Sequence, residues 1–212
     1  MTVVCGDDRG VRAAFSQPVG NQHAERLVGV VKEVLTKAGI QLSDVGLVGV
    51  INGPGSFTGL RVGISFIEGL AIALGIKTIG VNALDALAHA ALDSGGRLVS
   101  PVIDARKGQV YAAIYDVGSG APKLLSEYSA VRPEDWFAGL AAGTVVIGSG
   151  AETYKGMISD DHKHLVILDE TIATISPKVI YDMTISGPPI DPLELDAFYI
   201  RQADAICKPK QR

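Results

Sequence analysis

One stretch, residues 48–75, constrains the fold of this chain more than any other. It opens with β-prone apolar residues, passes through Gly53, Pro54 and Gly55, and continues as an almost entirely apolar run. Glycine permits positive φ angles and proline cannot continue a strand ladder, so the strand ends at these residues. Ser56 stands just before the apolar run and is a residue that caps helices. We therefore expect a strand, a glycine-rich turn and a long buried helix.

Two interpretations of this turn remain open from its local pattern. A strand leading through glycines into a helix presents free N–H groups and the positive end of the helix dipole, which suits a phosphate. However, Thr58-Gly59-Leu60 stands where a Walker A loop requires Gly-Lys-Ser/Thr, and the spacing from Gly55 to Gly59 is not that of a Rossmann loop. The other interpretation is a tight turn followed by close helix packing at Gly59 and Gly63.

Composition favours a globular protein with many tight turns. Of 212 residues, 47% are apolar and 20% charged, with 25 glycines and 10 prolines. The formal net charge of -4, with scattered basic residues, argues against RNA binding by this chain alone, because phosphate neutralisation dominates such binding. Any contact with RNA is expected to need a partner.

Several features predict a cytoplasmic protein. Cys5 and Cys207 lie near opposite ends without a zinc-ligand spacing, which indicates free thiols in a reducing compartment. No basic and apolar leader opens the sequence. The apolar run 62–76 is interrupted and shorter than the roughly 20 residues of a membrane span. We expect no membrane association.

The order of elements predicts a duplicated α/β unit. The first half is expected to contain a hairpin, a helix, a strand, the long helix, a second strand and a short helix, and a new hairpin near Arg97 begins the second half. We expect two lobes, residues 1–97 and 98–212. The predicted helices are 22–38, 59–74, 83–92, 133–142, one after Gly150, and 176–185, and the predicted strands include 46–51, 77–81, 99–104, 109–116, 145–147 and 165–168.

The histidines do not predict a metal or catalytic site. A metal pair on a helix needs ligands four residues apart, and Leu27 occupies that place after His23. His89 is expected to be structural, and the charged stretch 160–164 to be an exposed turn. Because neither a nucleophile with an evident base nor an HExxH helix is present, we expect no catalytic residue and no metal.

The turn that contains Asp104, Arg106 and Lys107 has two interpretations. It gathers a carboxylate and two cations at a strand end, so it is either an ordinary charged turn or part of a cleft between the lobes.

The string from Gly53 to Arg61, GPGSFTGLR, closely resembles the signature of the TsaB family, also called YeaZ. Four further segments, the helix that begins at His23 and residues 80–82, 104–111 and 198–204, resemble the family in the same order. The resemblance implies two RNase H-like lobes of the actin/sugar-kinase (ASKHA) type. Family members usually begin with a strand ending in Asp-Thr that this sequence lacks, so we expect the N-terminal lobe to lack its first strand. The alternative is that residues 1–7 are that strand and a later strand is lost.

The resemblance also implies a function. Members are non-catalytic partners of TsaD, which transfers a threonylcarbamoyl group to a tRNA adenosine near the anticodon, and the ATPase TsaE joins the complex. We therefore expect no independent activity, a TsaD-like and a TsaE-like partner, tRNA contact only through the complex, and a homodimer when alone. No tightly bound cofactor is expected, and ATP or ADP would lie at the complex interface. The alternatives are an ATP-dependent small-molecule kinase or ATPase of the same fold and, least favoured, a metallopeptidase.

Two sets of site residues follow from the resemblance. The loop is implied to be the remnant of a phosphate loop in a cleft formed by Gly53, Gly55, Ser56, Thr58, Gly59, Arg61, Asp104, Arg106 and Lys107. The first helix is implied to contact the partner through His23, Glu25, Arg26, Leu27, Val30, Val31 and Val34.

Overall fold

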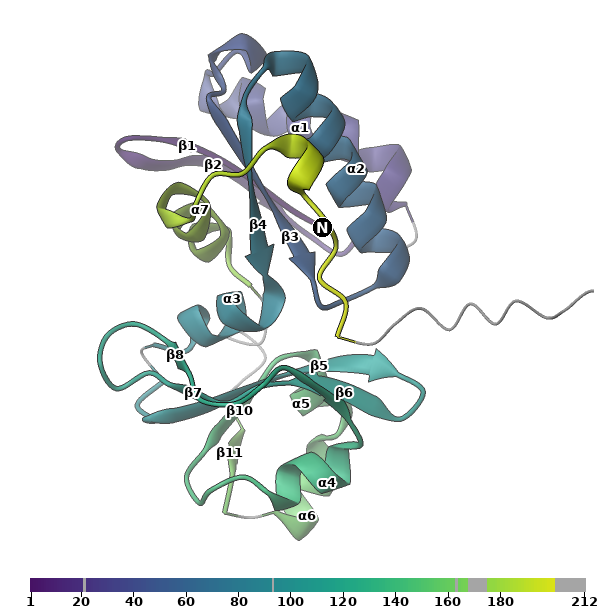
Figure 1. Cartoon of the computed structure of the whole chain (residues 1–212), viewed down its shortest axis with the longest axis vertical. Helices are drawn as coiled ribbons and strands as arrows, with labels where there is room; N and C mark the ends of the chain where they lie inside the picture. The colour runs from purple at the N-terminus through teal and green to yellow at the C-terminus, as the bar shows by residue number, and fades with distance from the viewer. Residues whose placement is uncertain (21, 93, 163, 168–174, 201–212) are drawn as a thin grey trace, which may run out of the picture.

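The structure is a computed structural model that describes residues 1–20, 22–92, 94–162, 164–167 and 175–200 (Figure 1). It is a mixed α/β fold. The strands and long helices of residues 2–82 lie together in the upper part of Figure 1, and the strands that follow residue 97 lie in the lower part with the helices of residues 133–161. The predicted order of hairpin, helix and strand is confirmed in both halves. However, the predicted strand 109–116 is broken at residues 113–114, and the short strands 123–124 and 129–131 were not predicted.

The N-terminal half begins with an antiparallel hairpin and continues with alternating strands and helices. The register of the hairpin pairs Thr2 with Ser16, and β3 and β4 are parallel. The two longest helices each end in a left-handed glycine, Gly39 at φ 69° and Gly75 at φ 68°, as their sequences predict. The elements are β1 (Thr2–Asp7), β2 (Gly10–Ser16), α1 (His23–Ala38), the 3-10 turn η1 (Leu42–Asp44), β3 (Leu47–Gly53), α2 (Phe57–Leu74), β4 (Lys77–Asn82) and α3 (Ala83–Ala90).

The C-terminal half contains one continuous sheet. Its main strands stand in the order β11-β10-β5-β6-β9, with β5 antiparallel to β6 and parallel to β10. The elements are β5 (Leu98–Arg106), β6 (Gln109–Ala112), β7 (Tyr115–Asp116), β8 (Lys123–Leu124), β9 (Ser129–Val131), α4 (Pro133–Ala138), β10 (Val145–Ile147), α5 (Ser149–Thr153), α6 (Lys155–Asp161), β11 (Val166–Ile167), α7 (Pro177–Ser186) and the 3-10 turn η2 (Pro192–Glu194).

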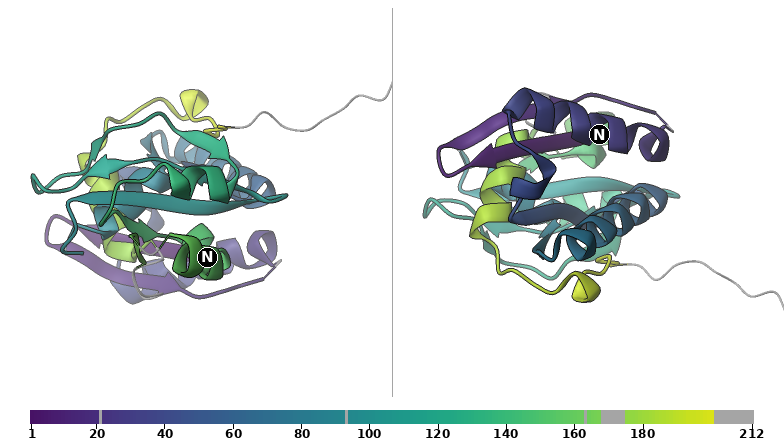
Figure 2. Two further views of the ribbon diagram at one scale, coloured as in Figure 1. Left: turned by 90° about the horizontal axis from the view of Figure 1, so that it is seen from below. Right: turned by 90° about the horizontal axis from the view of Figure 1, so that it is seen from above.

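The helix α7 returns to the N-terminal half, although it follows the C-terminal sheet in sequence. It packs against β1, β2, β3 and β4. Glycines make room for it: an added Cβ at Gly6 would lie 2.5 Å from the Tyr181 ring, and one at Gly49 would lie 2.2 Å from Thr184 Oγ1. The Tyr181 hydroxyl donates a hydrogen bond to the carbonyl of Asp7 at 2.5 Å. The segment after α7 then runs along β4 and α2, as the view from above in Figure 2 shows.

The two halves bury their central strands to different degrees. In the C-terminal sheet Val99 and Val102 of β5 are fully buried, at 0% exposure. In the N-terminal half β1 is half-buried throughout, and β3 is half-buried up to Gly53. The N-terminal strands form two separate two-stranded sheets, β1-β2 and β3-β4. Among the described residues no strand pairs with both β1 and β3.

The prediction that α2 is buried is wrong. Only Leu60, Ile64 and Ala71 of this helix are buried, which is 17% of its length. The helix packs against β3 and β4 on one side, and its remaining apolar surface borders a cavity or solvent. By length and composition alone α2 could cross a bilayer, but a helix that packs within a soluble fold passes the same test.

Candidate functional site

The signature loop is a strand–turn–helix junction, as predicted. Ser56 precedes α2, and its hydroxyl accepts a hydrogen bond from the Gly59 N–H at 3.4 Å. Gly53 has a φ of 134°, and an added Cβ there would lie 2.4 Å from the carbonyl oxygen of Phe198. Side chains other than hydrogen would therefore be strained and would collide with backbone. The glycine is fixed by the close approach of the C-terminal segment.

Residues 196–200, which we call the C-terminal segment, tie this loop to the other half of the chain. The Phe198 N–H donates to the carbonyl of Asn52 at 2.8 Å. The Phe198 ring meets the Tyr128 ring edge-on, with centroids 5.2 Å apart. In the opposite direction, the Asn52 amide donates to the carbonyl of Asp196 at 3.1 Å. The segment therefore bridges the end of β3 and the C-terminal half.

Arg61 of the signature takes part in the same arrangement. Its guanidinium lies 4.0 Å from the centre of the Phe57 ring, a cation–π distance, and its Nε donates to the Tyr199 hydroxyl at 3.3 Å. The Phe57 and Tyr199 rings are 5.6 Å apart. Arg61 thus contacts two aromatic side chains, the Phe57 ring and the Tyr199 hydroxyl of the C-terminal segment.

Within the Asp104 turn, Arg106 balances the negative charge of the Asp104 carboxylate. The Arg106 N–H donates to Asp104 Oδ1 at 2.9 Å, and the Arg106 guanidinium lies 3.6 Å from Oδ2. The backbone N–H of Asp104 donates to Ser149 Oγ at 3.2 Å. Arg106 and Lys107 both have positive φ angles, 63° and 54°, so this is a tight left-handed turn.

A large cavity of about 1440 Å³ brings together only part of the predicted cleft set. Gly55, Ser56 and Gly59 line it, together with Ser149 of α5. The other predicted members of the set lie outside its lining; they are Gly53, Thr58, Arg61, Asp104, Arg106 and Lys107. Ser149 lines the cavity and also accepts a hydrogen bond from the Asp104 backbone, whereas Asp104, Arg106 and Lys107 do not line it.

A tyrosine–carboxylate centre, in which Tyr115 is buried while Asp85 and Tyr128 are half-buried, joins the halves. The sequence did not predict it. Oδ1 of Asp85, in the first turn of α3, accepts hydrogen bonds from the hydroxyls of Tyr115 at 2.5 Å and Tyr128 at 2.8 Å. Burial, followed by the hydrogen bond to Asp85, raises the pKa of Tyr128 to about 12 and that of Tyr115 further. In the sequence, the one indication of this centre is that Asp85 follows the capping residue Asn82. Nothing in the sequence indicates which tyrosine side chains reach Asp85.

The predicted partner residues of α1 divide between surface and interior. Val30 and Val34 are 3% and 1% exposed, so the chain's own core covers them. Leu27 and Val31, which were also predicted to contact a partner, are half-buried and line the cavity. Glu25 and Arg26 are exposed as predicted, and the Arg26 guanidinium lies 5.7 Å from the Phe15 ring centre. The side chain of His23 lies outside the described part of the structure.

The described histidines do not form a metal site. Within the described residues no three His, Cys, Asp or Glu side chains converge on one point. His162 and His164 have ring centroids 5.9 Å apart, while the side chains of Asp160 and Asp161 lie outside the description. His89 is half-buried between α3 and α7, and desolvation lowers its pKa.

The family model and the similar sequences point to related proteins of one pathway. Residues 17–167 match the family model of TsaD, tRNA N6-adenosine threonylcarbamoyltransferase. The tRNA threonylcarbamoyladenosine biosynthesis protein TsaB of Escherichia coli is 37% identical over 161 residues, which are 74% of this chain and 69% of that protein. The TsaB protein of Bacillus subtilis is 31% identical over 153 residues, 71% of this chain and 66% of that protein.

Solved structures agree with these sequence matches. YeaZ from Pseudomonas aeruginosa superposes with a TM-score of 0.76 at 25% identity, covering 93% of both chains. A crystal structure of a Pseudomonas aeruginosa protein with similarity to peptidase YEAZ gives a TM-score of 0.78 at 26% identity, covering 94% of both chains. The resemblance in the signature loop thus extends to the whole fold, and this chain belongs to the TsaB (YeaZ) family.

Proposed function

We propose that this chain is a non-catalytic subunit of the machinery that forms tRNA threonylcarbamoyladenosine, and that it pairs with a TsaD-like protein. The observation that carries the proposal is the 37% identity to a TsaB protein over most of the chain. The loop supports a structural role, because the Ser56 hydroxyl accepts from the Gly59 N–H and the Arg61 guanidinium lies over the Phe57 ring. A kinase or ATPase would need cations at this loop to hold the phosphates.

The surface that supports pairing is the outer side of α1 and α2, two helices that contact each other. Val28 is 63% exposed and Ile72 is 53% exposed, which is unusual for large apolar side chains on helices. Gly29 and Gly69 have open space around their Cβ positions, so a partner helix could approach closely there. We name the exposed residues Val28, Gly29, Gly69 and Ile72 the helix-pair surface.

The finer architecture belongs to the same proposal. We propose two RNase H-like lobes of the actin/sugar-kinase type, predicted as residues 1–97 and 98–212, and the β11-β10-β5-β6-β9 order supports the second of them. Because α7 packs against β1, β2, β3 and β4, we assign this helix to the first lobe. The formal net charge of -4 supports tRNA contact only through the complex. The resemblance to TsaB proteins supports a cytoplasmic location and a TsaE-like ATPase as third member. We propose that ATP or ADP binds at the interface between subunits, and we expect the isolated chain to form a homodimer.

The test is reconstitution with purified components. The chain, a TsaD-like protein from the same cell and a TsaE-like ATPase are mixed with tRNA, ATP and a threonylcarbamoyl donor, and modified adenosine is quantified. We expect modification only when this chain and the TsaD-like protein are both present, and we expect the two to co-elute. ATP-dependent phosphorylation or ATP hydrolysis by this chain alone would instead favour the kinase or ATPase alternative.

A further inference from the structure

The described parts of the two halves meet at two separate places. The first is α3, which follows β4 in sequence but packs against β5 and buries Leu84 and Leu87 in the core of the C-terminal half. The second is the C-terminal segment. In Figure 1, α3 begins below the end of β4 and extends to the left, whereas the yellow chain that leads into the C-terminal segment descends to the right of β3.

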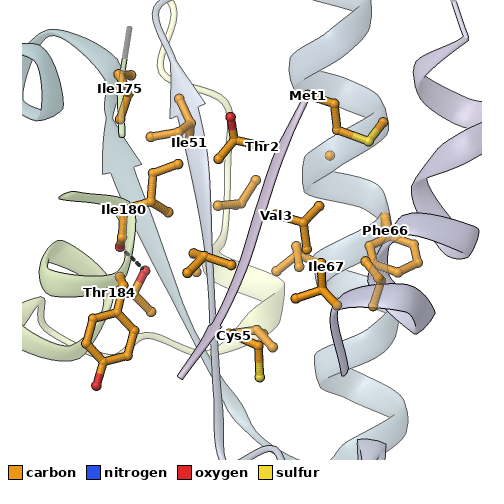
Figure 3. A pocket seen from close by; sticks show the side chains of 18 of the residues that line it. Met1, Thr2, Val3, Cys5, Ile51, Phe66, Ile67, Ile175, Ile180 and Thr184 are labelled. Carbon is orange, nitrogen blue, oxygen red and sulfur yellow. Dashed lines mark hydrogen bonds between the residues drawn. The ribbon is translucent and has the colours of Figure 1, made fainter. Parts of the chain in front are cut away.

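The contact at α3 is incompletely packed. On the side of the N-terminal half, α3 meets α7, whose Ile180 and Thr184 face β3 beside Ile51 in Figure 3. A pocket of about 270 Å³ lies between α3 and α7, and His89 and Met183 are among its lining residues. Because protein interiors that hold a fixed geometry are close-packed, this contact suits a hinge better than a rigid joint.

The chain that leads into the C-terminal segment is fixed to the N-terminal half. Ile190 and Thr78 of β4 exchange backbone hydrogen bonds of 2.9 and 3.1 Å in an antiparallel bridge. Leu195 is 6% exposed and packs against Leu60 of α2. Any movement of the N-terminal half therefore carries the start of the C-terminal segment with it.

Within the C-terminal segment, successive side chains contact opposite halves. Ala197 packs against the core of the N-terminal half, and Tyr199 contacts the signature loop. Phe198 lies edge-on against Tyr128, and Ile200 packs against the core of the C-terminal half. This period of two is that of an extended chain, in which neighbouring side chains point to opposite sides. The segment thus holds both halves at once.

Both sides of this contact are built from several interactions. In the C-terminal half, the Tyr128 hydroxyl donates to Asp85 at 2.8 Å, which fixes the ring that Phe198 meets. In the N-terminal half, the Phe198 N–H donates to the Asn52 carbonyl at 2.8 Å, and the Phe198 carbonyl oxygen lies close over Gly53. Phe198 cannot leave without losing the ring contact and the backbone hydrogen bond together.

We propose that the C-terminal segment is a clasp that holds the two halves at one fixed angle, so that the chain acts as a rigid body. A rotation about α3 would pull Phe198 and Ile200 away from the C-terminal half, because Leu195 keeps them on the N-terminal half. Many kinases work by hinge closure of two domains around the substrate, which a clasped chain cannot perform. The inference concerns the isolated chain and does not depend on the proposed function.

The angle between the halves is followed by single-molecule energy transfer between two dyes. The dyes are attached at Ser65→Cys in α2 and Ala138→Cys in α4, after the native thiols are removed by Cys5→Ala and Cys207→Ser. Both labelled positions are exposed, and both helices lie to the right of α3 in Figure 1. A rotation about α3 therefore changes the distance between the dyes.

The clasp is opened by the double substitution Phe198→Ser and Ile200→Ser. The matched control is Leu193→Ser, which changes an apolar residue that is 76% exposed in the chain leading to the segment. We expect one narrow distance distribution for the native segment and for the control. In the double variant, the fraction of molecules outside this distribution should rise at least about tenfold. A folded double variant with the native distribution would overturn the proposal, and so would two distributions in the native chain.

If the double variant does not fold, hydrogen exchange of the native chain decides. The Phe198 amide, which donates to Asn52, should exchange at least about a hundredfold more slowly than in an unstructured peptide. Weaker protection would overturn the proposal, because the segment would then be detached in more than about one molecule in a hundred.

Discussion

The backbone N–H of Phe198 donates a 2.8 Å hydrogen bond to the carbonyl of Asn52, which joins the C-terminal segment to the end of β3. These two residues are far apart in sequence, and the contact places the segment directly over the signature loop. A segment that comes after both halves of the fold in sequence therefore packs against the loop from outside.

Substitution of Gly53 tests this arrangement. Gly53→Ala places a Cβ 2.4 Å from the Phe198 carbonyl oxygen at a φ of 134°. We expect the free energy of unfolding to fall by about 2–3 kcal/mol, from backbone strain and displacement of the segment. Urea unfolding measures the change. The control is Gly156→Ala, a helical position with open space, which is expected to be neutral or slightly stabilising. Equal effects of the two substitutions would contradict the close approach.

Removal of the carboxylate at Asp85 tests the tyrosine centre. Asp85→Asn replaces a charge-assisted acceptor of two tyrosine hydroxyls, and we expect a loss of about 1–3 kcal/mol in unfolding free energy. The pKa of Tyr128, about 12 in the native chain, should fall but stay above 10, because burial remains its largest cause. Alkaline titration of tyrosine absorbance, with Tyr128→Phe to assign the signal, measures this shift. An unchanged Tyr128 pKa in Asp85→Asn would show that the carboxylate does not contribute.

His89 makes stability depend on pH in a defined direction. The pKa of His89 in the folded chain is lower than its usual 6.5, and desolvation by burial is the largest cause. The nearby carboxylates of Asp85 and Asp182 oppose this shift. The unfolded chain then binds more protons below pH 6.5, so the stabilisation by neutral His89 is present above this pH and is lost as the pH falls toward the folded pKa. We expect the urea midpoint to decrease between about pH 7.5 and 5.5. In His89→Gln the decrease should be smaller, and an equal decrease would assign the effect to other groups.

The helix-pair surface predicts which substitutions separate binding from folding. Val28→Asp and Ile72→Asp change side chains that are 63% and 53% exposed, so the chain should keep its melting temperature within a few degrees. Co-elution with the TsaD-like protein should be lost, because an unpaired charge would be buried at the interface. Val34→Asp, at a position that is 1% exposed, is expected to unfold the chain. Retained co-elution in both surface variants would place the interface elsewhere.

Local sequence pattern predicted the parts of the fold that depend on neighbouring residues. The turn after β3, the capping role of Ser56 and the glycines that end α1 and α2 follow from backbone conformations available to these residue types. The sequence also showed that no second metal ligand follows His23 and that the signature loop lacks the Gly-Lys-Ser/Thr of a Walker A loop. These features require only contacts within a few residues along the chain.

The apolar spacing indicates the core side of α1 but not that of α2. In α1, Val30 and Val34 lie four residues apart on one face and are buried, whereas Val28 lies off that face and is exposed. By contrast α2 is apolar nearly all round but mostly unburied. Such a helix gives no direction, because apolar residues suit a core, a partner surface or a cavity wall equally well.

The sequence by itself therefore determined the family, the main helices and strands and the local geometry of the signature loop, since these rest on short-range conformational preferences. The tertiary structure alone decided that Phe198 lies on Asn52, that Asp85 accepts from Tyr115 and Tyr128, and that β1 and β3 line one cavity. Those relationships depend on how distant elements dock, and docking is set by packing and strand pairing summed over the whole chain.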